Sequence, residues 1–300
     1  MNKLKIGLIA IAIIIVFASC EDMFRGAVLE VELPEHQSQL APYAFFKDLD
    51  STLIVKVGKS VGVLDTINPD LVFDATVELY KNGSLEHTFI YNSTINAYQV
   101  DLGQPFSPTA GDVYELRVAK EGFETASATQ IIPLPVPADS VQYIGQGGVN
   151  QFGDPMDIIN VTFTDPADMK NFYEFGGYVN VKYTDPFDTT MTYEYQSSFY
   201  FESSDPNFEN GALSDIAFDG QQYTIRLENY SSVWGDPADF EITGKLNFSS
   251  TTSEYATFIR SLNDYWNAGG NPFSEPVILY SNMSTGLGVF GVLVTDEFEF

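Results

Sequence analysis

The sequence predicts an all-β protein, with an N-terminal immunoglobulin-like or prealbumin-like β-sandwich followed by a second strand-rich β domain that carries one amphipathic helix. Short segments rich in β-branched and aromatic residues alternate apolar and polar side chains with a period of two, as half-buried strands do. Turn-forming Gly, Asn, Asp and Pro residues separate these segments. The stretch 253–267 instead spaces its apolar residues by three and four, which indicates a helix.

The first domain is predicted at 28–134. Its strand-like segments lie at 27–33, 52–57, 76–80, 86–91, 97–102, 113–119 and 125–132. Asn82 and Gly83, between two such segments, supply the positive φ angles of a tight hairpin. Strands of this length and number favour a sandwich. Prolines at 133, 135 and 137 cannot donate hydrogen bonds to a sheet, so we expect a stiff, proline-rich linker at 135–139.

The second domain is predicted at 140–300, with a helix near 253–267. Strand-like segments lie at 158–164, 173–183, 191–202, 222–228 and 240–249. In the helix, a stripe of apolar side chains lies on one face and is expected to pack against a sheet as core: Tyr255, Phe258, Ile259, Leu262 and Trp266. Gly269 and Gly270 are expected to end the helix.

The N-terminus resembles a bacterial lipoprotein signal. Residues 1–19 contain two lysines, an apolar run at 6–17 and small residues before Cys20. The run is shorter than the roughly 20 apolar residues that span a bilayer, so we expect cleavage between Ser19 and Cys20. Phe17-Ala18-Ser19-Cys20 resembles the lipobox, whose cysteine receives fatty acyl chains such as palmitate. Several chains anchor a protein stably in a membrane. The alternative is an ordinary cysteine after a plain signal peptide.

A short lipidated tether is expected at 20–27. Glu21 and Asp22 follow Cys20, and acidic residues at this place resemble the signal that moves Bacteroidota lipoproteins to the outer face of the outer membrane. We therefore expect an outer-membrane protein that faces the cell exterior, although solvated linker chemistry would explain the acidic pair too. The formal charge of −27 disfavours nucleic-acid binding, and solubility explains this charge equally well.

Two C-terminal stretches resemble a known family. They are Asn271-Pro272-Phe273-Ser274-Glu275-Pro276-Val277, and a later stretch with Asn282, Gly286, Gly288 and Phe290. Together with the segments 111–118 and 121–126, they resemble a Bacteroidota outer-membrane lipoprotein family known as domain of unknown function number four thousand two hundred and forty-nine. The resemblance implies a partner, because members are often encoded beside TonB-dependent receptors. We expect the glycines and Phe290 to have a structural role.

No catalytic motif stands out in the sequence. His36 and His87 are the histidines, and neither has the spacing of a metal site or a catalytic triad. We therefore expect no enzymatic activity, no cofactor and no metal. Asp-Ser or Asp-Thr steps at Ser51, Thr66, Ser140 and Thr189 resemble O-glycosylation acceptors of exported Bacteroidota proteins, and ordinary turn chemistry explains them nearly as well.

The leading functional hypothesis is a non-enzymatic, lipid-anchored surface protein that assists a TonB-dependent β-barrel transporter in substrate capture or import. Exposed aromatic side chains in 140–240 would contact this partner: Tyr178, Tyr195, Phe208, Tyr230 and, as the best candidate, Trp234. About half of such a set should prove to be core. A structural or adhesive glycan-binding surface protein is the alternative, and a hydrolase with a carboxylate site is a third, weaker reading.

Overall fold

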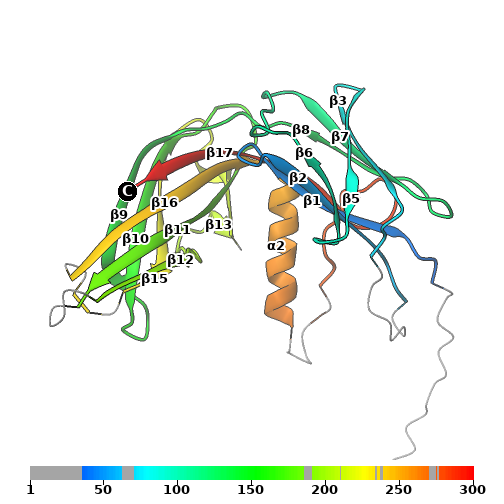
Figure 1. The fold of residues 1–300 in the computed structure, drawn as a ribbon. Coiled ribbons are helices and arrows are strands. Elements are labelled where there is room, and N and C mark those ends of the chain that lie inside the picture. The colour runs from blue at the N-terminus through cyan, green and yellow to red at the C-terminus, as the bar shows by residue number, and fades with distance from the viewer. Residues whose placement is uncertain are drawn as a thin grey trace, which may run out of the picture. The chain divides into compact units, whose positions relative to one another are not determined.

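A computed structural model of the chain describes residues 36–62, 71–185, 191–209, 211–233, 235–236, 239–269, 275 and 277–300 (Figure 1). Ser38–Phe300 forms one compact unit. This unit consists of β-strands with one α-helix, which confirms the predicted fold class. The predicted tether and the predicted strand at 27–33 lie outside the described residues. No described helix is both long enough and apolar enough to cross a membrane.

The first half of this unit contributes eight strands. They are β1 (Leu40–Lys47), β2 (Thr52–Lys59), β3 (Thr76–Lys81), β4 (Ser84–Thr88), β5 (Ile90–Asn92), β6 (Ala97–Asp101), β7 (Val113–Ala119) and β8 (Ala126–Ile131). Asn82 and Gly83, with φ of 49° and 80°, form the predicted hairpin between β3 and β4. The pattern missed β1, in which Ala41 and Pro42 weaken the alternation of apolar and polar residues.

The second half contributes nine strands, a 3₁₀ turn and the helix. They are β9 (Ala138–Val149), β10 (Pro155–Thr164), β11 (Phe172–Thr184), β12 (Thr192–Ser198), β13 (Phe208–Glu209), β14 (Ala212–Ser214), the turn Asp215–Ala217, β15 (Gln222–Tyr230), β16 (Phe240–Thr251), α2 (Ser253–Ala268) and β17 (Val289–Glu299). Strand β9 was also missed by the sequence pattern, since its sequence is rich in glycine and polar residues.

A ten-stranded sheet joins the two halves. Its order is β13-β14-β11-β16-β17-β1-β2-β6-β5, with β12 paired to β11. The four-stranded sheet β4-β3-β7-β8 and the three-stranded sheet β15-β10-β9 form two separate apolar cores with it. Phe290 and Val292 of β17 belong to the first core, and Phe298 packs on the second. Side chains two residues apart on a strand point to the same face, and Phe290, Val292 and Phe298 are separated by even numbers of residues. Both smaller sheets therefore cover the same face of the large sheet.

Strand β17 links the predicted domains directly. It pairs in parallel with β1, Tyr43 opposite Val289, and antiparallel with β16. The sequence assigned this strand to the second domain, yet it completes the core of the first. Within the predicted linker, Val136 is buried and its amide donates to Ser250 Oγ at 3.1 Å. The boundary at 135–139 itself stays a prediction.

Helix α2 lies on the other face of the large sheet and begins and ends where the sequence indicated. The Tyr255 ring lies 4.7 Å from that of Phe45, and the Phe258 ring lies 5.7 Å from that of Tyr43. The apolar stripe was only partly predicted, since Trp266 is 67% exposed rather than core. The reason is visible in Figure 1, where the C-terminal turns of α2 project beyond the sheet.

Candidate functional site

Many of the residues singled out in the sequence lie outside the described part of the chain. These are Ser19, Cys20, Thr66, Thr189, Trp234, Asn271, Pro272, Phe273 and Pro276. Ser51, in the turn before β2, and Ser140, on β9, are described and exposed, so their hydroxyls are accessible. Accessibility is what modification requires, and their glycosylation stays a prediction.

The remaining motif residues fasten β17 to β1. The Asn282 side chain donates to the Phe290 carbonyl at 2.7 Å and accepts from the Phe290 amide at 3.0 Å. Gly286 and Gly288 have φ of 81° and 117°, and a Cβ on them would lie 2.3 and 1.9 Å from the carbonyl oxygens of Leu40 and Pro42. These glycines allow backbones to approach closely, and the motif therefore has a structural explanation.

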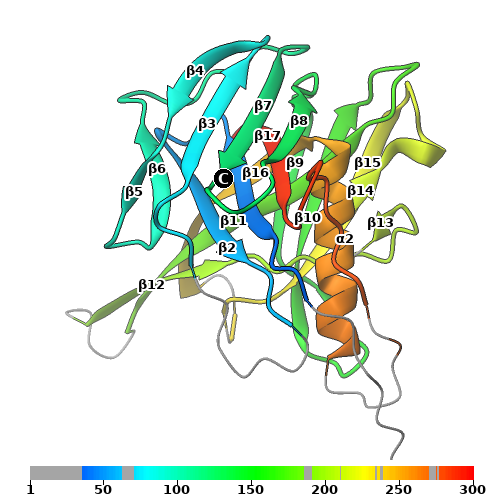
Figure 2. The same ribbon diagram turned by 90° about the vertical axis from the view of Figure 1, so that its right-hand side faces the viewer.

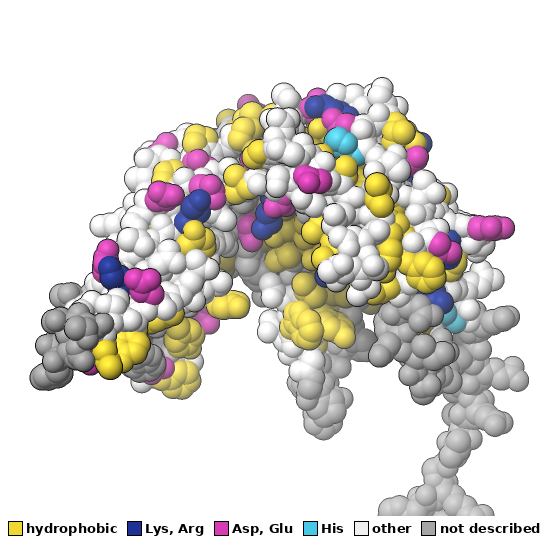
Figure 3. All heavy atoms as spheres, in the orientation of Figure 1, with side chains coloured by type: hydrophobic (Ala, Val, Ile, Leu, Met, Phe, Trp, Pro, Cys, Tyr) yellow, Lys and Arg dark blue, Asp and Glu magenta, His cyan; other side chains and the backbone are white. Residues whose placement is uncertain are grey.

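A group of large exposed aromatic side chains lies at one end of the second half. We call it the aromatic end, and its members are Phe152, Tyr193, Tyr195, Tyr200 and Tyr230. Phe152 and Tyr200 are 78% and 81% exposed. Hydrophobic side chains gather at this end in Figure 3, at the lower left. Such a concentration of exposed rings is typical of a surface that contacts a partner.

Strand register places these side chains together. Pro155 lies opposite Val149 and Met156 opposite Tyr230, so the β9–β10 turn and the end of β15 coincide. Hydrogen bonds then connect neighbouring segments: Asn150 Nδ2 lies 3.4 Å from Tyr230 Oη, Tyr195 donates to the Ser232 carbonyl, and the Tyr200 amide donates to Asn229 Oδ1 at 2.7 Å. The aromatic end is thus built on strands and turns whose positions are fixed.

The buried carboxylate of Asp157 organises the backbone beneath the aromatic end. Its oxygens accept from Gln146 N at 2.8 Å, Tyr143 Oη at 2.9 Å and Ser232 N at 3.3 Å. The Gln146 side chain in turn donates to the carbonyls of Val233 and Gly235 at 3.1 and 2.9 Å. Burial of Tyr143 beside this carboxylate raises the pKa of the phenol. Asp157 and the Gln146 side chain therefore hold the backbone at Ser232, Val233 and Gly235 by hydrogen bonds.

The exposure expected of the aromatic side chains in 140–240 was found for some of them, and their contact with a partner stays a prediction. Tyr195 and Tyr230 are exposed, whereas Tyr178 is half-buried and Phe208 packs against the second core. Phe152 and Tyr200 were missed. The local signal for Phe152 was its position in the turn Asn150-Gln151-Phe152-Gly153, where strand periodicity does not explain an aromatic residue.

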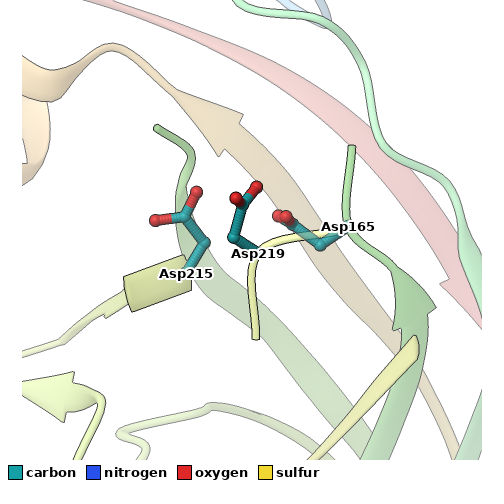
Figure 4. Close-up of side chains that lie close together, drawn as sticks. All are labelled: Asp165, Asp215 and Asp219. Atoms are coloured by element: carbon teal, nitrogen blue, oxygen red, sulfur yellow. The ribbon is translucent and has the colours of Figure 1, made fainter. Parts of the chain in front are cut away.

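Three carboxylates form a second group that no sequence motif indicated. Oxygen atoms of Asp165, Asp215 and Asp219 lie within 4.8 Å of one another, and the first two residues are buried (Figure 4). Burial raises the pKa of Asp215, and the charges of Asp165 and Asp219 raise it further against the opposing effect of the Asn171 amide. Carboxylate oxygens are the ligands that hard cations such as Ca²⁺ prefer, but Ca²⁺ takes about six to eight oxygen ligands and this group supplies three residues.

Hydrogen bonds show that these carboxylates connect two loops. Asp165 accepts from Tyr173 Oη and from the Gly220 amide, the latter at 3.0 Å. Asp215 accepts from the Asn171 amide at 2.6 Å, and Asp219 accepts from the Asp168 amide at 3.1 Å. Each aspartate thus accepts a backbone N–H of the opposite loop. This arrangement accounts for the group structurally without a reaction.

Comparison with known proteins gives a family and little else. The model of a domain of unknown function, DUF4249, matches residues 28–299. The chain belongs to the DUF4249 family. No curated protein matches it. Among solved structures, it is similar to a "Biofilm associated protein - B domain", with 6% identity, 86% of this chain and 85% of that chain covered, and a TM-score of 0.16. A likeness at that TM-score carries no information about fold or function.

Proposed function

We propose that this chain is a lipid-anchored, non-enzymatic outer-membrane protein that faces the cell exterior and assists a TonB-dependent transporter in substrate capture or import. The aromatic end is the surface that contacts the transporter. The carrying observation is that its exposed rings stand on hydrogen-bonded strands and turns above the buried Asp157. A rigid aromatic surface loses little conformational entropy on binding, so its burial contributes affinity.

The anchor is the second part of this proposal. The family match begins at residue 28, directly after the predicted signal peptide and tether. The described surface carries many carboxylates, which anionic lipid head groups repel, so attachment depends on the acyl chains of Cys20. We expect Cys20→Ser to leave the protein as unprocessed precursor or to release it from the membrane fraction. If the variant is processed to the mature form and still remains in the membrane fraction after a high-salt wash, a lipid anchor on Cys20 is excluded.

The contact surface is tested by co-purification from native outer membranes under gentle extraction. The double variant Phe152→Ser and Tyr200→Ser removes the two most exposed rings of the aromatic end. As a matched control, Ile90→Ser removes a side chain that is 75% exposed on β5, at the far edge of the large sheet. We expect the double variant to recover at least tenfold less transporter than wild type, because each ring in a contact centre contributes about 1–3 kcal/mol.

The control should recover as much transporter as wild type, and all three proteins should unfold at similar urea concentrations. Equal recovery with the double variant would exclude the aromatic end as the contact. Absence of any transporter in the wild-type preparation would exclude the accessory function itself.

A glycan-binding adhesin is the second candidate, and the same rings favour it. Tyrosine rings stack on sugars and their hydroxyls can bond to them, and Tyr200 and Tyr193 are both exposed. A glycan array separates the two functions, because an adhesin binds immobilised glycans without any transporter. Glycan binding by the wild type that is lost in Tyr200→Ser would favour the adhesin. If neither protein binds any glycan, the transporter accessory stays the proposal.

A further inference from the structure

A cavity of about 640 Å³ lies along the outer edge of β8, away from the aromatic end. Three kinds of wall surround it: the end of β8 with the prolines that follow, the loop before β11 with Phe172, and the junction of β16 with α2. Ile131, Leu134 and Met169 line it and are exposed apolar residues. Its volume is within the range of pockets that bind small molecules.

The edge of β8 inside this cavity has free backbone groups. Strand β8 is the outermost strand of its sheet, on the side nearest α2 in Figure 2. The Ile132 amide donates to Asp112 O at 2.9 Å, so residues 132, 130, 128 and 126 direct their N–H and C=O groups toward β7. Thr129 and Ile131 therefore direct theirs outward. Among the described residues, neither has a backbone partner on that side.

The neighbouring outward residue shows what this edge binds. At Ser127, the carbonyl accepts from Ser284 N at 2.7 Å, and the amide donates to Ser284 Oγ at 3.2 Å. The segment at Ser284 thus pairs with the first part of the β8 edge, and this pairing ends before Thr129. An open edge of this kind is usually protected in native proteins. Here the unprotected part lies within the cavity.

A buried amide side chain gives an independent indication of an occupant. Gln130 is 1% exposed and lines the cavity, and neither its Oε1 nor its Nε2 has a hydrogen-bond partner among the described residues. A buried amide without partners is costly, and such groups in native proteins are bonded to protein, water or ligand. An occupant with both a donor and an acceptor satisfies Gln130. A peptide group has both.

The charges in the cavity favour a neutral occupant. Lys170 brings an ammonium, which lies 4.9 Å from the centre of the Phe172 ring. Glu254 brings a carboxylate in the first turn of α2. The amides of that turn have no side-chain cap from Thr252, and by themselves would attract an anion. Glu254 opposes an anion there, whereas neutral peptide carbonyls can accept from these amides.

We propose that this cavity binds an extended peptide segment of a partner protein, which adds as a further strand to the edge of β8 at Thr129 and Ile131. Main-chain hydrogen bonds to these two residues supply the common part of recognition, and the apolar walls select an alternating apolar side chain. The inference stands on the β8 edge and Gln130. It does not depend on the transporter or on the aromatic end.

Hydrogen exchange of the full chain in detergent tests this proposal. The probe is a pool of hexapeptides in which Val, Ile, Leu or Phe alternates with Thr. With peptide at saturation, we expect the Thr129 and Ile131 amides to exchange at least tenfold more slowly. Outward amides of β4, at the opposite edge of the same sheet, serve as the internal control and should not change. Unchanged exchange at Thr129 and Ile131 overturns the proposal.

Two matched changes identify the hydrogen bonds. In an extended peptide, the N–H groups at odd and at even positions point to opposite edges, and one of these edges faces β8. Of two peptide series, N-methylated at odd or at even positions, one should therefore bind at least tenfold more weakly than the other. In the protein, Ile131→Pro removes an outward N–H that β7 does not use, and we expect at least tenfold weaker binding. Gln130→Leu should retain the fold, because leucine is similar in size to glutamine. It should weaken peptide binding several-fold, because it removes the amide group that bonds to the peptide.

Other occupants give distinct results. Protection of Thr129 and Ile131 by acetate alone assigns the cavity to a small anion at the start of α2 and overturns the peptide proposal. Equal binding of both N-methylated series does the same, because it shows that the backbone of the peptide is not recognised.

Discussion

Gly286→Ala should destabilise the protein far more than Gly122→Ala, although the two glycines have nearly the same backbone conformation. Their φ angles are 81° and 84°. An added Cβ at Gly122 meets nothing within 4 Å, whereas at Gly286 it lies 2.3 Å from the Leu40 carbonyl oxygen. The left-handed conformation costs an alanine about 1–2 kcal/mol at either site. The difference between the variants therefore isolates the close contact.

The additional cost at Gly286 follows from the surrounding contacts. The Cβ must move by about 1 Å to reach an ordinary contact of 3.4 Å. That movement breaks the hydrogen bond from Leu287 N to Leu40 O, which is 2.9 Å long. Leu40 is buried, and an unsatisfied buried carbonyl costs about 1–3 kcal/mol. Added to the cost of the left-handed conformation, this gives an expected loss of about 2–5 kcal/mol for Gly286→Ala, against about 1–2 kcal/mol for Gly122→Ala.

Urea denaturation of both variants and wild type measures these values. Equal slopes with urea concentration would show that the variants expose the same surface on unfolding, so that their midpoints can be compared. Equal losses for the two variants would refute the reasoning, since they would show that the junction of β1 and β17 tolerates a side chain. A larger loss for Gly122→Ala would refute it as well.

Two further predictions concern burial. Asp215→Asn should raise the free energy of unfolding at pH 7, because the pKa of Asp215 is raised in the fold and its ionised form is disfavoured there, while the asparagine oxygen still accepts from the Asn171 amide. The extra stability of the variant should shrink as the pH falls through the raised pKa of Asp215 and vanish below the ordinary value of 3.8. Extra stability that does not change with pH would show that ionisation of Asp215 is not its cause. Phe258→Ala should lower the free energy of unfolding by about 3–5 kcal/mol, and Trp266→Ala, which removes an exposed side chain, by less than about 1 kcal/mol. Urea denaturation measures both losses, and similar losses would mean that Trp266 is packed.

Local signals in the sequence predicted the elements that depend on neighbouring residues. Asn82-Gly83 determines a hairpin because few other pairs adopt two positive φ angles in succession. The 3.6-residue spacing in 253–267 predicted α2, and Gly269 follows its last residue. The same stripe failed at Trp266, because periodicity defines a face of a helix but not how far the sheet beneath it extends.

The aromatic end was partly predictable for the same reason. An aromatic residue within a turn, such as Phe152, has no strand periodicity that would bury it. Sequence could not show that Phe152, Tyr200 and Tyr230 lie together, since they come from separate segments. Asp157 could not be identified either, because its role depends on donors from Tyr143, Gln146 and Ser232 rather than on a motif.

The sequence by itself determined the strand-rich composition, the hairpin, the helix and the family resemblance. The tertiary structure alone decided that β17 pairs with β1, where Tyr43 lies opposite Val289, and that one sheet thereby joins both halves. It also decided that Asp165 meets Asp215 and that the β8 edge opens into a cavity at Thr129. Local propensity acts over a few residues, whereas such contacts arise only when burial of apolar side chains brings distant segments together.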